Sequence, residues 1–299
     1  MATTPAQPSA SRAGDGILSL MAGASLISFS AVCVKLAHVG PTMAGFYRMF
    51  FGGLVLAGLL LAQGVKLRVP RRDLGLSLAC AFFFALDLTF WHRSIHYVGP
   101  GLGTILSNFQ VFFLAGIGAL FFGERLGWRL AVAIPLALGG LFLLVRPDRA
   151  GLPPDYLPGV GFGLLTALVY AAYLLTLRRL QAEHAPDRVR ANMVIISLAC
   201  AAMLGGEAWL LGESFAIPDA QSWGALLGYG LVGQVLGWVF ISRGLPRTPA
   251  ARAGLILLLQ PTLSFVWDLL FFARPTTPVE LVGAVGALVA IYLGATSRT

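Results

Sequence analysis

The chain has 299 residues, of which 57% are hydrophobic and only 11% are charged, and its mean hydropathy is +0.80. A soluble domain carries about 25% charged residues, so a chain this apolar could not cover a water-facing surface and is an integral membrane protein. The formal net charge of +8 does not indicate a nucleic-acid partner, because the basic residues form short clusters between apolar runs, as in loops at a membrane surface.

Residues 1–15 are rich in Ala, Ser, Thr and Pro and are expected to form a disordered cytoplasmic tail, with no signal peptide. From residue 16 onward, Gly, Pro and charge clusters divide the chain into apolar runs of about 20 residues, the length that crosses a hydrocarbon core about 30 Å thick. The sequence therefore predicts an all-α integral membrane protein. Its ten predicted transmembrane helices are residues 16–37, 41–63, 74–97, 99–122, 127–146, 157–179, 190–211, 221–243, 249–273 and 277–296.

The distribution of basic residues predicts how these helices are oriented. With the N-terminus inside, fifteen Arg and Lys residues lie at cytoplasmic ends and five lie at outer ends. Both termini are therefore expected to be cytoplasmic, in a multi-pass protein of the cell inner membrane. The connections between helices are short, so any function must lie between the helices.

The two halves of the chain are similar to each other. Shifted by 150 residues, SNFQVFFLAGIGALFFGERL (107–126) aligns with LLLQPTLSFVWDLLFFARPT (257–276), and Gln110 is paired with Gln260. Five helices per half is an odd number, so the second copy must be inserted upside down. Inverted repeats are the architecture of secondary transporters, whose halves rock about a site between them.

Motifs along the chain resemble the drug/metabolite transporter superfamily, EamA type. Lys35 closes the first helix, FYRMFFGGLVLAGLLL places Arg48 in the second, and SIHYVGPGLGTIL joins the third to the fourth. FFGERLGWRLAVAIPLALGGLFLLV contains a Gly-Glu turn and a Gly-rich fifth helix, and YAAYLLTLRRL opens the second half. The resemblance implies two inverted EamA repeats, expected at residues 16–146 (helices 1–5) and 157–296 (helices 6–10), with a linker at 147–156 and a tail at 297–299.

The chain departs from the family pattern at two places. Ile27-Ser28 stands where the first helix of the family usually has Trp-Gly. Ala273-Arg274 stands at the end of the ninth helix, where the family usually has Gly-Glu. The second departure makes the outer end of the ninth helix atypical.

Three polar residues on consecutive helices are predicted to share one layer of the membrane. At 1.5 Å per residue, Arg48, Asp87 and Asn108 are roughly 10–15 Å below the outer surface. A carboxylate and a guanidinium at this depth should neutralise each other rather than face lipid alone. We therefore expect an Asp87–Arg48 ion pair that faces the interior, either as a structural pair or as a pair that lines the pathway or breaks during opening. Trp91, one turn from Asp87, is expected either on the same lining face or in the interfacial aromatic belt.

Polar and aromatic residues also recur at helical spacing on four predicted helices. Such stripes on apolar helices fit a ligand cavity, although hydrogen bonding between helices explains each stripe alone equally well. Pro261 removes a backbone donor at mid-membrane, and the kink expected there suits a gating element. The stripes are Thr104, Asn108 and Phe112 in helix 4; Thr166, Tyr170 and Tyr173 in helix 6; Gln234 and Trp238 in helix 8; and Gln260 and Ser264 in helix 9.

Other polar and small residues are expected to have structural roles. Arg93 is predicted to reach water at the outer boundary, and Glu207 to be solvated among headgroups. Three small-xxx-small pairs are predicted to be close-packing or sliding surfaces rather than ligand sites. These pairs are Gly159/Gly163, Gly224/Gly228 and Gly233/Gly237.

The sequence thus predicts a secondary transporter of a small polar or zwitterionic metabolite, such as an amino acid or a metallophore derived from amino acids. The resemblance implies export as the commoner direction. There are two alternatives: an importer of a vitamin- or nucleotide-like metabolite, and a membrane scaffold or sensor that does not transport. An enzyme, a cofactor and a metal site are not expected, because no Ser/His/Asp set, HExxH motif or catalytic carboxylate pair is found. The expected partners are the lipid bilayer and the substrate, and the protein is either a monomer or a homodimer.

Overall fold

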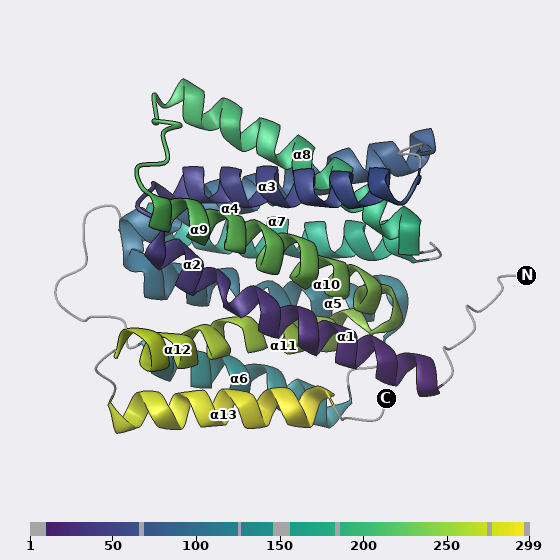
Figure 1. Cartoon of the computed structure of the whole chain (residues 1–299). Coiled ribbons are helices and arrows are strands. Elements are labelled where there is room, and N and C mark those ends of the chain that lie inside the picture. The colour runs from purple at the N-terminus through teal and green to yellow at the C-terminus, as the bar shows by residue number, and fades with distance from the viewer. Residues whose placement is uncertain are drawn as a thin grey trace, which may run out of the picture.

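The protein is a bundle of helices that run side by side (Figure 1). The computed structural model describes residues 10–65, 69–124, 127–145, 156–182, 186–273 and 277–295, and these ranges contain no strand. Seven helices are long and apolar enough to cross a membrane. Three shorter apolar helices, Gln110–Phe122, Trp128–Leu143 and Pro278–Leu293, complete the set. Together, the seven long and three shorter helices correspond one by one to the ten predicted helices. The prediction of an all-α multi-pass membrane protein is confirmed.

Several of the ten spans are divided into shorter helices. The first half consists of α1 (Ala10–Ser28), α2 (Ser30–Leu36), α3 (Pro41–Ala62), α4 (Arg71–Ser107), α5 (Gln110–Phe122) and α6 (Trp128–Val145). The second half consists of α7 (Tyr156–Gln181), α8 (Pro186–Leu210), α9 (Ala220–Gly228), a π-helix (Tyr229–Gly237), α10 (Trp238–Gly244), a 3₁₀ turn (Leu245–Arg247), α11 (Ala250–Leu257), α12 (Leu259–Phe272) and α13 (Pro278–Ala295). Following the predicted orientation, we call the end of the bundle with residues 37–40, 211–219 and 273 the outer end and the opposite end the inner end.

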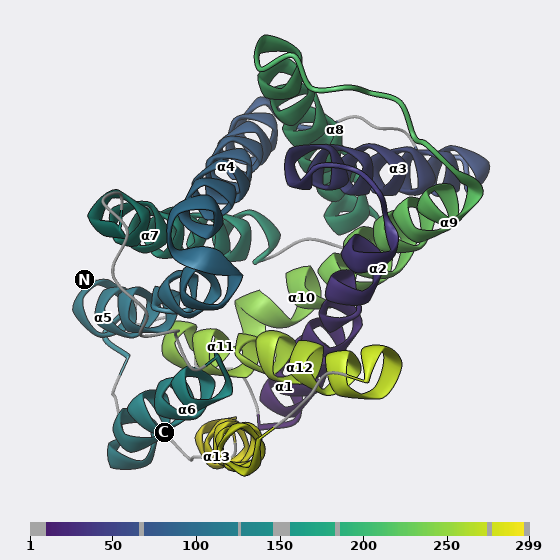
Figure 2. The same ribbon diagram turned by 90° about the vertical axis from the view of Figure 1, so that its left-hand side faces the viewer.

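Helix α4 differs from the predicted boundary between the third and fourth helices, which lay at residue 98. It continues to Ser107, and the interruption falls at Asn108–Phe109. A straight helix would separate Ser94 from Leu106 by about 18 Å. Both nevertheless lie beside Gly163 of α7, because a Cβ atom at Gly163 would be 2.9 Å from Ser94 Oγ and 2.6 Å from Leu106 Cβ. Helix α4 therefore bends back between these residues (Figure 2).

The packing of the helices is symmetric when the two halves are exchanged. Spans with equivalent positions pack on each other, as α3 does on α8, α6 on α13 and α5 on α11. The contact of α4 with α7 has its counterpart in the contact of α1 with α10. The breaks in the helices match as well, since Leu258 follows Asn108 by 150 residues. The chain therefore folds as two five-helix halves, and the second repeats the helix order of the first in the opposite orientation across the membrane.

The eighth span contains nine consecutive residues of π-helix between α9 and α10. A π-helix is rare and is mostly a single-turn bulge, frequently at a functional site. Glycines in this segment allow close contact with two other spans. A Cβ atom at Gly237 would lie 2.4 Å from Ile27 Cγ1 of α1, and one at Gly230 would lie 2.9 Å from the backbone nitrogen of Gly52 in α3. The π-helix is thus held between α1 and α3.

Only some of the predicted glycine pairs are packed closely. Gly163 and Gly237 are in tight contact with other spans, and a Cβ atom at Gly233 would lie 3.2 Å from Ser30 Oγ. By contrast, a Cβ atom at Gly224 would meet no atom within 4 Å, and one at Gly228 would meet only Cys33 Sγ at 4.0 Å. The close packing expected at Gly224/Gly228 is therefore wrong, because among the described residues only Cys33 of α2 comes near this face of α9, and only at the limit of van der Waals contact.

Candidate substrate site between the two halves

Four aromatic rings from both halves meet in the interior, and we call Phe84, Tyr170, Tyr173 and Trp238 the aromatic cluster. Phe84 of α4 stacks on Tyr173 of α7, with ring centres 4.7 Å apart. Trp238 of α10 lies 5.3 Å from Phe84 and 5.0 Å from Tyr173. Tyr170 lies 6.2 Å from Tyr173 and 6.5 Å from Trp238. Three predicted lining residues, Tyr170, Tyr173 and Trp238, are thus brought together, and the ring of Phe84, which was not predicted, joins them through Tyr173 and Trp238.

Arg48 of α3 lies beside the aromatic cluster and is only 5% exposed. Its guanidinium carbon is 5.7 Å from the centre of the Phe84 ring and 4.9 Å from the centre of the Tyr229 ring. Its Nη1 donates a hydrogen bond of 3.1 Å to the hydroxyl of Tyr229. Cation–π attraction and this bond stabilise a charge that has little access to water.

Asp87 follows Phe84 by one turn of α4 and is 8% exposed. It is close enough to interact electrostatically with Arg48 and with Tyr170. In the described part of the chain, however, no nitrogen of Arg48 lies within 4.0 Å of its carboxylate. The direct ion pair expected from the sequence is not formed, and the guanidinium contacts the Tyr229 hydroxyl through Nη1 instead. Two opposite charges therefore share one buried region without direct contact.

Several buried polar atoms in this region have no hydrogen-bond partner among the described residues. They include Nε and Nη2 of Arg48, the hydroxyl of Tyr173, Nε1 of Trp238 and Oε1 of Gln234. The other amide atom of Gln234, Nε2, donates to Ser197 Oγ at 2.9 Å. An unpaired buried polar atom costs about 1–3 kcal/mol, so a group of them indicates that water or a ligand completes the site.

Ser264 joins the ninth span to the first, whereas the carbonyl of Gln260 accepts a hydrogen bond within its own helix. Ser264 Oγ donates to the carbonyl oxygens of Ser28 at 3.0 Å and of Gln260 at 2.9 Å. Nε1 of Trp267 donates to Ser28 Oγ at 2.7 Å, so the Ser that replaces the usual Gly of the family has a partner. Pro261 lies in the first turn of α12, three residues after the break at Leu258, where proline is tolerated. Its role as a hinge stays a prediction.

The predicted stripe of the fourth helix is not continuous. The break at Asn108–Phe109 changes the direction of the residues that follow it. Phe112 is consequently 44% exposed, and its ring lies 5.5 Å from that of Phe109 rather than in the aromatic cluster. Asn108 is buried at the break. The side chain of Thr104 lies outside the described residues.

Two further predicted residues lie outside the aromatic cluster. The Thr166 hydroxyl donates to the carbonyl oxygen of Phe162, one turn earlier in α7, at 2.9 Å. Trp91 is partly buried, and its ring lies 5.3 Å from that of His92. The hydrogen bond of Thr166 is local to its helix, which is the ordinary arrangement for a threonine in a membrane span.

At the outer end, Arg93 and Glu207 join α4 to α8. Arg93 Nη1 lies 3.3 Å from Glu207 Oε1, and the hydroxyl of Thr89 also donates to the Glu207 carboxylate. The sequence places both charges at the outer membrane boundary, and the side chain of Arg93 is 42% exposed there. The contact between the two side chains is an addition that the sequence does not predict.

At the inner end, Glu124 joins three spans. Its Oε2 and Oε1 accept hydrogen bonds from the backbone nitrogen of Ala250, at 2.8 and 2.9 Å. Its Oε1 also lies 2.9 Å from Arg178 Nη1. The first N–H groups of a helix have no partner within the helix and carry partial positive charge, so a carboxylate stabilises the start of α11.

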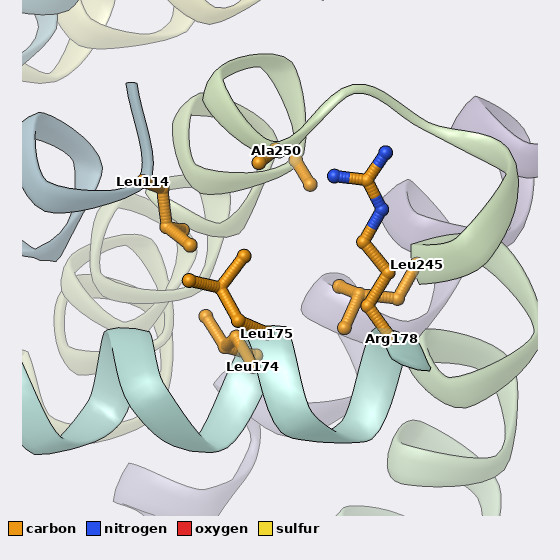
Figure 3. Close-up of a pocket in the computed structure, with 7 residues that line it drawn as sticks. Leu114, Leu174, Leu175, Arg178, Leu245 and Ala250 are labelled. Carbon is orange, nitrogen blue, oxygen red and sulfur yellow. The ribbon is translucent and has the colours of Figure 1, made fainter. Parts of the chain in front are cut away.

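A small pocket adjoins this contact (Figure 3). Arg178 extends from α7 toward the start of α11, and the rest of the lining is apolar. This composition offers no set of convergent polar groups for a polar ligand. The lining residues are Leu114, Leu174, Leu175, Arg178, Leu245, Ala250 and Ala253.

Sequence reasoning missed Phe84, Tyr229 and Ser197 at the site. Phe84 precedes Asp87 by three residues, and this helical spacing could have found it. Tyr229 precedes Gln234 by five residues, a spacing that puts two residues on different faces of an α-helix but close together in a π-helix, whose hydrogen bonds join residues five apart. Ser197 has no signal beyond its place in an apolar helix.

Comparisons with known proteins agree with this architecture. The EamA-like transporter family model matches residues 15–146 and 157–296. The pseudopaline exporter CntI of Pseudomonas aeruginosa is 26% identical over 285 residues, which are 94% of this chain and 95% of that protein. The threonine/homoserine exporter RhtA of Escherichia coli K12 is 28% identical over 168 residues, 55% of this chain and 54% of that protein. A crystal structure superposes with a TM-score of 0.80 at 19% identity, over 94% of this chain and 96% of the other, which shows the same fold. The chain therefore belongs to the EamA-like transporter family, within the drug/metabolite transporter superfamily.

Proposed function

We propose that this protein is a secondary transporter that exports a small polar or zwitterionic metabolite across the inner membrane by alternating access. An amino acid or a metallophore derived from amino acids fits this description. The observation that carries the proposal is the buried region shared by Arg48, Asp87 and the aromatic cluster, between the two halves. Opposite charges that are not in direct contact can each bind the opposite charge of a zwitterion, and the rings can bind its apolar part or its ammonium group.

The relatives support export as the direction. CntI is named as an exporter of pseudopaline and is similar to this chain over nearly its whole length. RhtA is named as an exporter of threonine and homoserine, which are amino acids, and is similar over about half of its length. Import of a vitamin- or nucleotide-like metabolite is the alternative within the same class, and a scaffold or sensor is the alternative outside it.

The packing of the helices suggests how the two sides alternate. The buried region is formed by both halves, so rocking of one half against the other would expose it at one end and cover it at the other. At the inner end, the contact of Glu124 with the start of α11 and with Arg178 has to separate before a cytoplasmic metabolite enters. Three modes of transport are compatible with the proposal: proton coupling, substrate exchange, and facilitated diffusion down the substrate gradient. None of them requires ATP.

The proposal is tested by comparative metabolomics of medium and cells, with and without the protein. We expect one or a few amino-acid-like metabolites to accumulate in the medium when the protein is present, and this accumulation to be lost in Trp238→Ala. The matched control is Gly224→Ala, because the added Cβ meets no neighbour within 4 Å. Accumulation inside the cells would indicate an importer. If no metabolite changes although the protein is present in the membrane, a scaffold or sensor is favoured instead.

Counterflow in proteoliposomes separates transport from indirect effects on metabolism. The metabolite found in the medium is loaded inside the vesicles, and uptake of its labelled form is measured. Transport of the compound by the purified protein is the expected result. The same preparation, analysed by light scattering in detergent, distinguishes a monomer from a homodimer.

A further inference from the structure

The buried guanidinium of Arg48 has one occupied side and one open edge. Nη1 donates to the Tyr229 hydroxyl at 3.1 Å. Nε and Nη2 are buried and have no hydrogen-bond partner in the part of the chain that the structure describes. These two nitrogens form the side-on edge of the guanidinium, whose two N–H groups point in the same direction. This is the edge that binds a carboxylate through two parallel hydrogen bonds.

We infer that Arg48 is the carboxylate-binding residue of the central site and that Tyr229 is its positioning residue. The inference rests on the proposed function and adds to it a requirement, namely that each transported metabolite carries a free carboxylate. An unpaired edge on a buried cation is strongly unfavourable. A ligand that binds reversibly to this edge is the simplest reason for leaving it without a partner in the protein.

Tyr229 fixes the plane in which the edge lies. Its ring centre is 4.9 Å from the guanidinium carbon, and its hydroxyl accepts from Nη1. The centre of the Phe84 ring lies 5.7 Å from the same guanidinium carbon. A guanidinium held by two rings and a hydrogen bond loses little freedom when it binds an anion, so the site is preorganised. The π-helix carries Tyr229 and therefore takes part in recognition.

The charges nearby favour a carboxylate over a phosphate. Asp87 interacts electrostatically with Arg48 without occupying its open edge, and a second negative charge on the ligand would be repelled by it. A metabolite with one carboxylate and one ammonium group satisfies both side chains. The remainder of such a metabolite would meet the aromatic cluster, where Tyr173 and Trp238 hold unpaired polar atoms.

The first experiment measures binding without transport. The unfolding temperature of the purified protein in detergent is followed while acetate, propionate or glycine is added, and the matched amides serve as controls. We expect carboxylates to raise the unfolding temperature of the natural protein and amides to leave it unchanged. In Arg48→Gln the effect should require about a hundredfold more carboxylate or disappear, and in Tyr229→Phe it should require about tenfold more.

Further variants keep this test informative if Arg48→Gln folds poorly. Arg48→Lys retains the charge without the two-nitrogen edge and should bind carboxylate more weakly than Tyr229→Phe does. Gly224→Ala should respond like the natural protein. Equal stabilisation by amides or by inorganic phosphate, or an unchanged response in Arg48→Lys and Arg48→Gln, would overturn the inference.

The second experiment separates this inference from the proposed function. If the protein exports a metabolite, every exported compound should carry a free carboxylate, and its methyl ester should not compete in counterflow. An exported compound without a carboxylate contradicts the role of Arg48 and leaves the export function intact. Carboxylate binding that depends on Arg48, in a protein that exports nothing, contradicts the export function alone.

Discussion

Gly123 and Ala273 lie 150 residues apart in the sequence and end the fourth and ninth spans in the same left-handed backbone conformation, with φ angles of 62° and 46°. Glycine adopts this conformation without steric cost, whereas a residue with a Cβ atom loses about 1–2 kcal/mol. Ala273 is the only non-glycine residue with positive φ among those the structure describes. The second half of the protein is therefore strained at the position where the first half is relaxed.

Replacing Ala273 by Gly should relieve this strain and raise the free energy of unfolding by about 1 kcal/mol, even though glycine gives the unfolded chain more freedom. Gly123→Ala should lower it by a similar amount. Both are measured by unfolding of the purified protein in detergent. Gly116→Ala is the control, because its added Cβ meets nothing within 4 Å and its φ is not positive. An Ala273→Gly variant that is no more stable than the natural protein would contradict the argument.

Glu124 should contribute more to stability than an exposed carboxylate at the same end of the bundle. Glu124→Ala removes the cap of α11 and the partner of Arg178, and we expect a loss of about 2 kcal/mol. Glu124→Gln keeps an oxygen acceptor for the Ala250 N–H and should lose about half of that. The exposed residue Asp15 provides the control Asp15→Asn, which should leave unfolding unchanged. Equal unfolding temperatures for Glu124→Ala and Asp15→Asn would exclude this role.

Gly237→Ala should destabilise the contact between the eighth and first spans. The added Cβ would lie 2.4 Å from Ile27 Cγ1, and overpacking of this kind costs about 1–3 kcal/mol. Gly224→Ala on the same span meets no neighbour and should be neutral or slightly stabilising, because alanine favours a helix over glycine. Similar unfolding temperatures for these two variants would show that the eighth span can move away from α1 at little cost.

Asp219 at the outer end should make stability depend on pH. Hydrogen bonds from the backbone N–H of Ser222 and from His38 lower its pKa from the ordinary 3.8. A folded-state pKa below the unfolded one means that the contribution to stability is complete above about pH 4 and is lost as the pH falls through the folded value. Asp219→Asn, which still caps α9, should weaken this acid-side dependence. If Asp219→Asn and the natural protein lose unfolding temperature to the same extent between pH 5 and pH 2.5, the predicted role of Asp219 is contradicted.

The number and order of the spans could be predicted from the sequence, because the length of an apolar run and the residues that interrupt it are local properties. The bend between Ser94 and Leu106 could not be placed in this way. Gly99-Pro100-Gly101 suggests a boundary between helices, yet helical backbone continues through it and the interruption falls at Asn108–Phe109. The packing of α4 on α7 overrides the local signal there.

The candidate site was predicted in part. Depth in the membrane follows from counting residues along each helix. This count predicted that Arg48 and Asp87 lie at nearly the same depth, and the two residues do lie in one buried region. The direction in which a side chain points around its helix depends on packing and on winding, which counting does not provide. Tyr229 took the place of Asp87 as the direct partner of Arg48 because a π-helix turns it toward α3.

The contact at Glu124 also makes the two ends of the molecule unequal. At the positions 150 residues away from Glu124 and Ala250, the sequence has Arg274 and Pro100. A guanidinium accepts no hydrogen bond and a proline has no N–H to donate, so neither member of the contact is repeated in the other half. The inner end therefore holds a carboxylate contact between three spans that the equivalent positions of the other half cannot form, and we expect Glu124 to add to the free energy needed to separate the helices at that end.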